Sequence, residues 1–143
     1  MTAFYHVCFA VAELERAMAD LTASAGVEWR EIRRDRIGDW DFRIVFSVGG
    51  PPYFELIEAG PGSPWDASDG PHFHHLGFWS SSLTAGSDRL DRAGFPSEFS
   101  GCPYGRSFAY HRVDSIGAAL ELVDASRQPG FLDGIPMPAI EEG

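Results

Sequence analysis

Short segments in which apolar and polar residues alternate recur along the chain, and two Ala- and Leu-rich stretches interrupt them. The alternation, with a period of two, predicts strands at 4–11, 27–37, 41–48, 52–59, 73–79, 97–100, 106–112 and 118–125. The Ala- and Leu-rich stretches predict helices at 13–25 and 83–93, each of which ends near a glycine, as helices often do. The predicted order of elements is therefore βαβββ, repeated once.

The two halves also resemble each other in sequence. The segment HVCFAVAELERAMADL, which begins at His6, aligns with HLGFWSSSLTAGSDRL, which begins at His75. Later in each half, ELIEA at 55–59 aligns with ELVDA at 121–125. The identities are few, but both halves keep the same order of a strand headed by histidine and a strand that carries glutamate. This order indicates an internal duplication.

Successive side chains of a strand point to opposite faces, so each strand can be divided into a helix-packing face and an open face. In the first strand, Val7 and Phe9 belong to the helix-packing face, which leaves His6 on the open face. The same reading places His74 on the helix side of the fifth strand. The polar residues predicted on the open face are His6, Glu55, His75 and Glu121.

Two imidazoles and two carboxylates on one face suit a divalent cation of borderline hardness. One such residue alone would more often be a structural histidine or an edge charge, but the duplicated placement favours a metal site. We therefore expect one divalent ion, Zn, Ni, Co, Mn, Fe or Mg, held by His6, Glu55, His75 and Glu121. By contrast, His72 and His74 are expected to be surface or helix-side residues.

Composition predicts one compact domain, since 143 residues with 44% hydrophobic content suffice for one core. The net charge of -10 disfavours nucleic acid and anionic membranes as partners. No apolar run approaches the ~20 residues that span a bilayer, so we expect a cytoplasmic protein with a small-molecule partner. The two cysteines, Cys8 and Cys102, form no CxxC motif and are read as ordinary thiols.

The domain is expected to cover residues 1–126. Within it we place module one at 1–59, a linker rich in turn formers at 60–72, and module two at 73–126. The Pro-containing tail, 127–143, is predicted to be an irregular extension.

The duplicated βαβββ unit, with HVCFAV and HHLGF heading the halves and YFELIE and ALELVD closing them, resembles the vicinal oxygen chelate superfamily. The turn at Asp114 and Gly117 is similar to a D-P-x-G turn of that superfamily. The resemblance implies an α+β fold in which the two modules form a curved eight-stranded mixed sheet around a metal-binding cleft. The four ligand positions of that superfamily match His6, Glu55, His75 and Glu121 here.

Within the superfamily, the four-ligand pattern is most similar to methylmalonyl-CoA epimerase and glyoxalase I. The resemblance implies an isomerase or lyase that abstracts a proton next to the carbonyl of a small oxo-compound or acyl thioester. Glu121 is the preferred base, with Glu55 as the alternative. The epimerases' separate catalytic glutamate has no clear match among the acidic residues Glu28, Glu31, Asp39 and Asp41.

Two other functions remain open. One is a metal-free protein that binds an antibiotic or intermediate, as bleomycin-resistance relatives do; the 13% aromatic content suits planar ligands. The other is an extradiol-type dioxygenase, which would use only three protein ligands. A homodimer is expected, with the modules pairing either within one chain or between two chains. Residues expected to contact the substrate are Tyr53, Trp79, Arg106, Tyr110 and His111.

Overall fold

The computed structural model describes residues 3–133. Module one contains β1 (Phe4–Ala10), α1 (Leu14–Ala25), β2 (Arg33–Ile37), β3 (Trp40–Phe46) and β4 (Tyr53–Ala59). Module two contains β5 (His72–Ser80), α2 (Leu83–Arg92), β6 (Ser97–Ser100), β7 (Phe108–Val113) and β8 (Ala118–Asp124). Three short 3-10 helices, η1 (Cys102–Tyr104), η2 (Asp114–Ile116) and η3 (Ala125–Arg127), precede a last helix, α3 (Gln128–Asp133).

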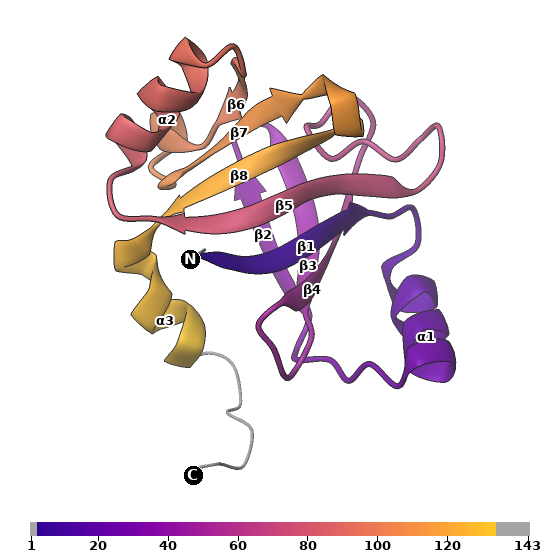
Figure 1. Ribbon diagram of the computed structural model, residues 1–143. Helices are drawn as coiled ribbons and strands as arrows, with labels where there is room; N and C mark the ends of the chain where they lie inside the picture. Colours follow the sequence, from indigo (N-terminus) through magenta and orange to yellow (C-terminus); the bar gives the residue numbers. More distant parts are fainter. Residues whose placement is uncertain (1–2, 134–143) are drawn as a thin grey trace, which may run out of the picture.

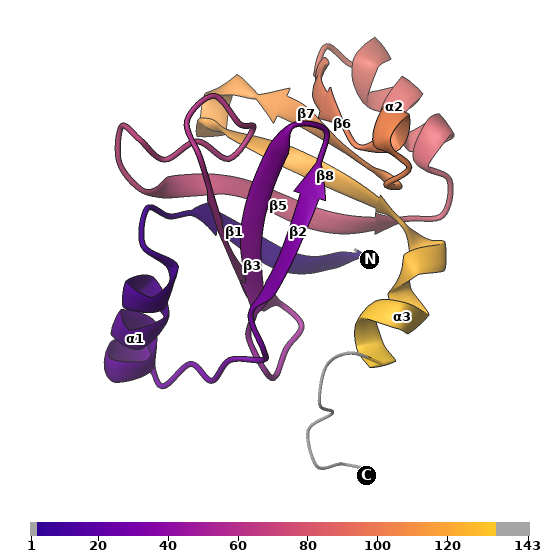
Figure 2. The ribbon, with the colours of Figure 1, turned by 180° about the vertical axis from the view of Figure 1, so that it is seen from behind.

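All eight strands form one sheet in the order β2-β3-β4-β1-β5-β8-β7-β6. The sheet is mixed, because β1 pairs with β4 and β5 with β8 in parallel, whereas the other neighbours are antiparallel. The antiparallel pair β1–β5 joins the two modules within one chain. The sheet curls so that β2 and β3 lie across the central strands, with α1 and α2 at opposite ends of the molecule (Figures 1 and 2). The predicted fold class, α+β with two βαβββ modules, is confirmed.

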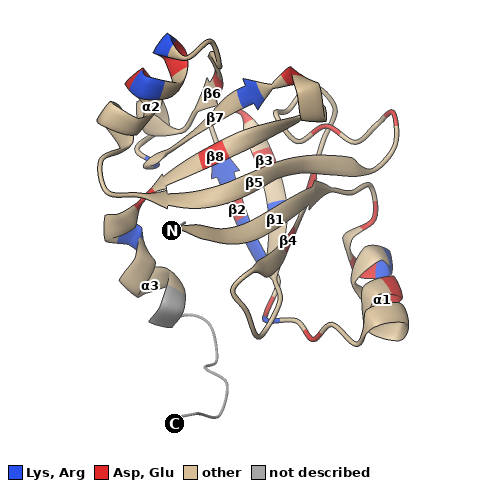
Figure 3. Cartoon of the chain, viewed as in Figure 1, with Lys and Arg blue, Asp and Glu red and all other residues tan. Residues whose placement is uncertain are grey.

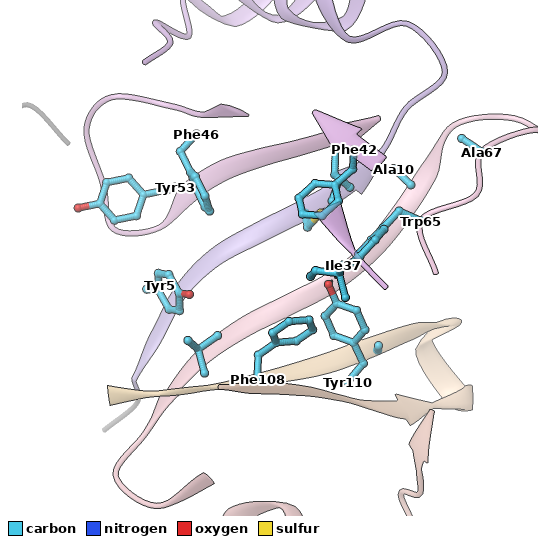
Figure 4. Packing of buried hydrophobic residues seen from close by; sticks show 14 residues of the cluster. Tyr5, Ala10, Ile37, Phe42, Phe46, Tyr53, Trp65, Ala67, Phe108 and Tyr110 are labelled. Carbon is cyan, nitrogen blue, oxygen red and sulfur yellow. Dashed lines mark hydrogen bonds between the residues drawn. The ribbon is translucent and has the colours of Figure 1, made fainter. Parts of the chain in front are cut away.

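The buried apolar residues divide between the two faces of the sheet, as the alternation predicts. The inner face carries the largest cluster, which is rich in aromatic rings, and Figure 4 shows Phe42 of β3 and Phe108 and Tyr110 of β7 within it. On the outer face, Val11 and Leu56 pack around Leu14 of α1, and a smaller cluster lies beneath α2. Helices α1 and α2 therefore cover the outer face and leave the inner face of the curl to form a site.

The structure departs from the predicted elements at two places. The segment 27–37 is a strand only from Arg33, because the Trp29 indole Nε1 donates to the Met18 carbonyl and holds the earlier part against α1. Only a single bridge, between Trp29 and Ser47, links that part to the sheet. The tail is not irregular at its start, since α3 occupies 128–133 and its Phe131 packs on the inner cluster; the rest of the tail lies outside the described residues.

The segment between the modules is anchored to the core. Its Trp65 is buried, and the indole Nε1 donates a hydrogen bond of 2.8 Å to the Tyr110 hydroxyl of β7. Among the described residues, no helix is both long and apolar enough to cross a membrane.

Candidate metal centre

The four polar residues predicted on the open face come together at the centre of the sheet. They lie on its four middle strands, with His6 on β1, Glu55 on β4, His75 on β5 and Glu121 on β8. Each module therefore supplies one imidazole and one carboxylate. One ligand atom from each residue lies within 4.8 Å of the other three.

The ring nitrogens and carboxylate oxygens converge on a common point. His6 Nε2 lies 2.9 Å from Glu55 Oε1 and 3.1 Å from Glu121 Oε1. For His75 Nε2 the corresponding distances are 3.3 and 3.1 Å, and the two Nε2 atoms are 2.9 Å apart. Both histidines are 1% exposed and both glutamates 7% exposed. Four donor atoms that face one another in a buried position have the arrangement of a metal-ligand set.

The charges of the four groups balance one another. Burial raises the pKa of both carboxylic acids, but the imidazoles of His6 and His75 outweigh burial and hold both pKa values below the usual range. Burial opposes the charged form of His6 as well, yet Glu55 and Glu121 raise its pKa to about 9. Two buried carboxylates thus require positive charge beside them.

A divalent cation would also meet that requirement. Glu55 Oε1 is buried and has no well-aligned hydrogen bond within residues 3–133, although His6 Nε2 lies 2.9 Å away. Mixed nitrogen and oxygen donors suit zinc, iron, nickel, cobalt or manganese. The residues present therefore fit a metal ion, with Glu55, Glu121 and the two Nε2 atoms as its ligands.

Irregular pairing between β1 and β5 brings two further side chains inward. The register skips one residue in each strand, Tyr5 in β1 and His74 in β5, each directly before its candidate ligand. A bulge of this kind turns neighbouring residues to the same side. The expectation that His74 lies on the helix side or the surface is therefore wrong: its side chain is buried against His75. Strict alternation along the strand could not reveal this.

His74 determines how the proton of His75 is placed. The His74 Nε2–H donates to the Pro64 carbonyl at 2.8 Å, which leaves Nδ1 as an acceptor. Burial and the charge of His75 lower the pKa of His74 to about 4, so this acceptor is free at neutral pH. His75 Nδ1–H then donates to His74 Nδ1 at 2.8 Å. In neutral His75 the proton therefore stays on Nδ1, and the Nε2 lone pair is directed at the other three ligand atoms.

Replacing His74 with phenylalanine is expected to weaken metal binding. The change removes the acceptor that fixes the His75 tautomer while keeping an aromatic ring in the space. Loss of such an outer hydrogen bond typically costs about 10- to 100-fold in metal affinity. Competition with a chromophoric chelator measures this affinity, with His72→Phe at an exposed position of the same strand as the control. Equal affinities in the two variants would show that His74 has no such role.

A cavity of about 600 Å³ opens beside His6, Glu55 and Glu121 on the inner face. Of the residues expected to contact a substrate, Trp79, Arg106 and Tyr110 line this cavity. Tyr110 is also packed against the His75 ring, with centroids 4.8 Å apart.

The other two expected contact residues lie elsewhere. Tyr53 is buried in the inner cluster, 5.3 Å from the ring of Phe131, and does not line the cavity. The placement of His111 in the cleft is wrong, because alternation along β7 turns it to the outer face. There Ser87 and the Phe95 carbonyl hydrogen-bond its ring.

Phe131 of α3 is a cavity residue that sequence reasoning missed. Its ring packs edge-on against Tyr5, Phe46 and Trp79, with centroids 4.9 to 5.7 Å apart. A single phenylalanine in a Pro- and Gly-containing tail gave no periodic signal that could have placed it there.

Comparison with known proteins identifies the family. A family model described as the Glyoxalase/Bleomycin resistance protein/Dioxygenase superfamily matches residues 5–126. The chain belongs to this superfamily. It is the vicinal oxygen chelate superfamily that the sequence motifs resemble. No curated protein gives a significant match to this chain.

Several solved structures share the vicinal oxygen chelate fold. Methylmalonyl-CoA epimerase from Mycobacterium tuberculosis is 19% identical, with a TM-score of 0.61 over 85% of this chain and 87% of that one. A Streptomyces coelicolor epimerase variant in complex with 2-nitronate-propionyl-CoA is 15% identical, with a TM-score of 0.59 over 87% and 99%. A mutant of 4-hydroxymandelate synthase from Streptomyces coelicolor is 17% identical, with a TM-score of 0.60 over 85% and 47%. At these identities the likeness establishes the fold.

Proposed function

We propose that the protein is a divalent-metal-dependent isomerase or lyase that removes a proton next to the carbonyl of a small oxo-compound or acyl thioester. The observation that carries the proposal is the convergence of His6, Glu55, His75 and Glu121 beside a cavity of about 600 Å³. Membership of the superfamily and the epimerase among the similar structures support an enzyme of this kind.

The reaction requires stabilisation of charge and movement of a proton. A divalent ion, when bound, stabilises the negative charge that develops on the carbonyl oxygen. The cavity would hold the substrate carbonyl beside the cluster, where the rings of Trp79 and Tyr110 border the space. A volume of this size is typical of a small-molecule site.

Glu121 is the proposed general base. Its carboxylate lines the cavity, and the imidazoles keep it ionised at neutral pH, so it can accept a proton from a neighbouring carbon. Glu55 also lines the cavity and is the alternative. Either carboxylate would return the proton to the same carbon in an epimerisation or to a neighbouring atom in an isomerisation.

The aromatic lining of the cavity favours one competing function, the sequestration of a planar ligand without chemistry. Tyr5, Phe46, Trp79, Phe108 and Phe131 all border the cavity. Aromatic faces of this kind bind planar molecules by stacking. Binding of such a ligand would survive metal removal, whereas the proposed reaction would not.

Metal-dependent exchange of a carbon-bound proton tests the proposal. Chelator-treated protein should take up about one Zn²⁺, Ni²⁺ or Co²⁺ per chain. The loaded protein should then exchange the proton next to the carbonyl of an oxo-acid or acyl thioester in a panel with solvent deuterium, as followed by NMR. His75→Ala should lose both properties and His72→Ala neither. Failure to bind metal, or exchange that is equal in loaded, chelated and His75→Ala protein, would reject the proposal.

A further inference from the structure

Five arginines line the cavity, and within the described residues four of them form no ion pair. Arg106 is the paired one, since its guanidinium makes two hydrogen bonds to the Asp35 carboxylate, at 2.8 and 3.1 Å. Within the part of the chain that the structure describes, no ion pair involves the remaining four, Arg30, Arg33, Arg34 and Arg127.

This gathering of arginines without ion pairs does not come from a shortage of acidic residues. The chain has 21 acidic residues against 11 basic ones. Away from the cavity, Arg16, Arg36 and Arg112 each pair with an aspartate. In residues 3–133, the only unpaired arginines outside the cavity are Arg89 and Arg92 of α2. Arginines without ion pairs therefore collect around one cavity of an acidic protein. Figure 3 shows basic positions along β2 and directly before α3.

The side chain of Arg30 gives the most direct indication that a ligand binds in this cavity. Its backbone N–H donates to the Phe46 carbonyl at 3.0 Å, which fixes the residue beside the end of β3. Its side-chain Nε is buried and has no hydrogen-bond partner among the described residues. A buried guanidinium N–H without an acceptor is unfavourable, so an acceptor from a bound molecule would satisfy it.

We infer that Arg30 is the anchor of a subsite that binds an anionic group, a carboxylate or a phosphate, of the substrate. The planar guanidinium fork matches the oxygens of both groups. Arg33, Arg34 and Arg127 add attraction around the same cavity.

The inference names a substrate class for the proposed function: oxo-compounds or acyl thioesters that carry an anionic group. It rests on the proposed function for the placement of the reacting carbonyl at the four-residue cluster. A substrate carbonyl would lie at the four-residue cluster while the anionic group of the same molecule pairs with Arg30. Neutral oxo-compounds would lack the second contact and bind more weakly. The arginine subsite itself needs no metal, so it can be tested alone.

Binding of small anions to the metal-free protein tests the subsite. Malonate, its neutral diamide malonamide, and inorganic phosphate would each be titrated into chelator-treated full-length protein and followed by NMR or calorimetry. Malonate or phosphate should bind and malonamide should not. Arg30→Gln should weaken the anion at least about tenfold, the effect of losing a charge-assisted hydrogen bond. The control Arg89→Gln removes the same charge from α2 and should bind as the wild type does.

The outcomes separate the subsite from the reaction. Tighter binding of malonate assigns the group to a carboxylate, and tighter binding of phosphate assigns it to a phosphate. The inference is overturned if the Arg30→Gln and Arg89→Gln proteins bind the anion with equal affinity. It is also overturned if malonamide binds as tightly as malonate, or if no anion binds. Because metal is absent throughout, these results stand even if deuterium exchange is never found; conversely, metal-dependent exchange does not rescue a failed subsite.

Discussion

Gly77→Ala is expected to abolish metal binding while the protein stays folded. A Cβ at this position would overlap the His6 ring, lying 2.6 Å from Nε2 and closer still to Cε1 and Nδ1. Real Cβ atoms do not approach other atoms this closely, so the imidazole must move away from the other three ligand atoms. Metal affinity should fall by at least about 100-fold. Overpacking of this kind destabilises a core by about 1–3 kcal/mol.

Metal titration and thermal unfolding of the same preparation separate these two effects. The matched control is Gly60→Ala, because a Cβ there meets open space and that backbone does not require glycine. It should bind metal as the wild type does. If Gly77→Ala binds metal with wild-type affinity, then either the His6 ring is not held as described or His6 is not a ligand.

Glu121→Gln is expected to stop proton exchange and leave the metal in place. The amide keeps an oxygen and almost the same volume but loses the basicity that proton transfer requires. Loss of a general base typically costs about a hundredfold to ten-thousandfold in rate. Deuterium exchange on the substrate found in the panel should therefore fall sharply, while metal content and melting temperature change little.

The parallel variant Glu55→Gln makes the assignment of the base specific. If Glu121 is the base, Glu55→Gln should retain more exchange than Glu121→Gln at equal metal content. A Glu121→Gln protein that stays loaded and exchanges at the wild-type rate would remove Glu121 from the chemistry. A joint loss of metal and exchange would limit Glu121 to the role of a ligand.

Much of the inner face could be predicted from the sequence, because both halves repeat a pattern whose period is fixed by strand geometry. His6 and Glu121 come from distant segments, yet alternation alone assigned each to the open face. In the structure, His6 Nε2 lies 3.1 Å from Glu121 Oε1. The same rule failed at His74, since a bulge adds a residue to β5 and reverses the local alternation. Bulges depend on the pairing of two strands, and pairing is not visible in either strand alone.

Features that depend on tertiary packing also could not be predicted from the sequence. Phe131 reaches the cavity because a short helix packs on the inner cluster, and this contact leaves no periodic trace in the sequence. Conversely, His111 has the residue type of a binding group but lies beneath α2. Arg30 belongs to a segment read as strand, and only the three-dimensional structure shows that its Nε is buried without a partner.

The division of the four-residue cluster between the modules makes metal affinity a measure of how the two halves associate. β1 and β4 carry one imidazole and one carboxylate, β5 and β8 carry the other pair, and the β1–β5 seam brings the pairs together. A separated half would offer a cation only two donors, which is half of a tetrahedral set. Two half-length polypeptides would therefore have to reassociate before they could hold the ion tightly, and the ion would in turn strengthen their association. In the intact chain this coupling would tie the stability of the seam to occupancy of the proposed metal site.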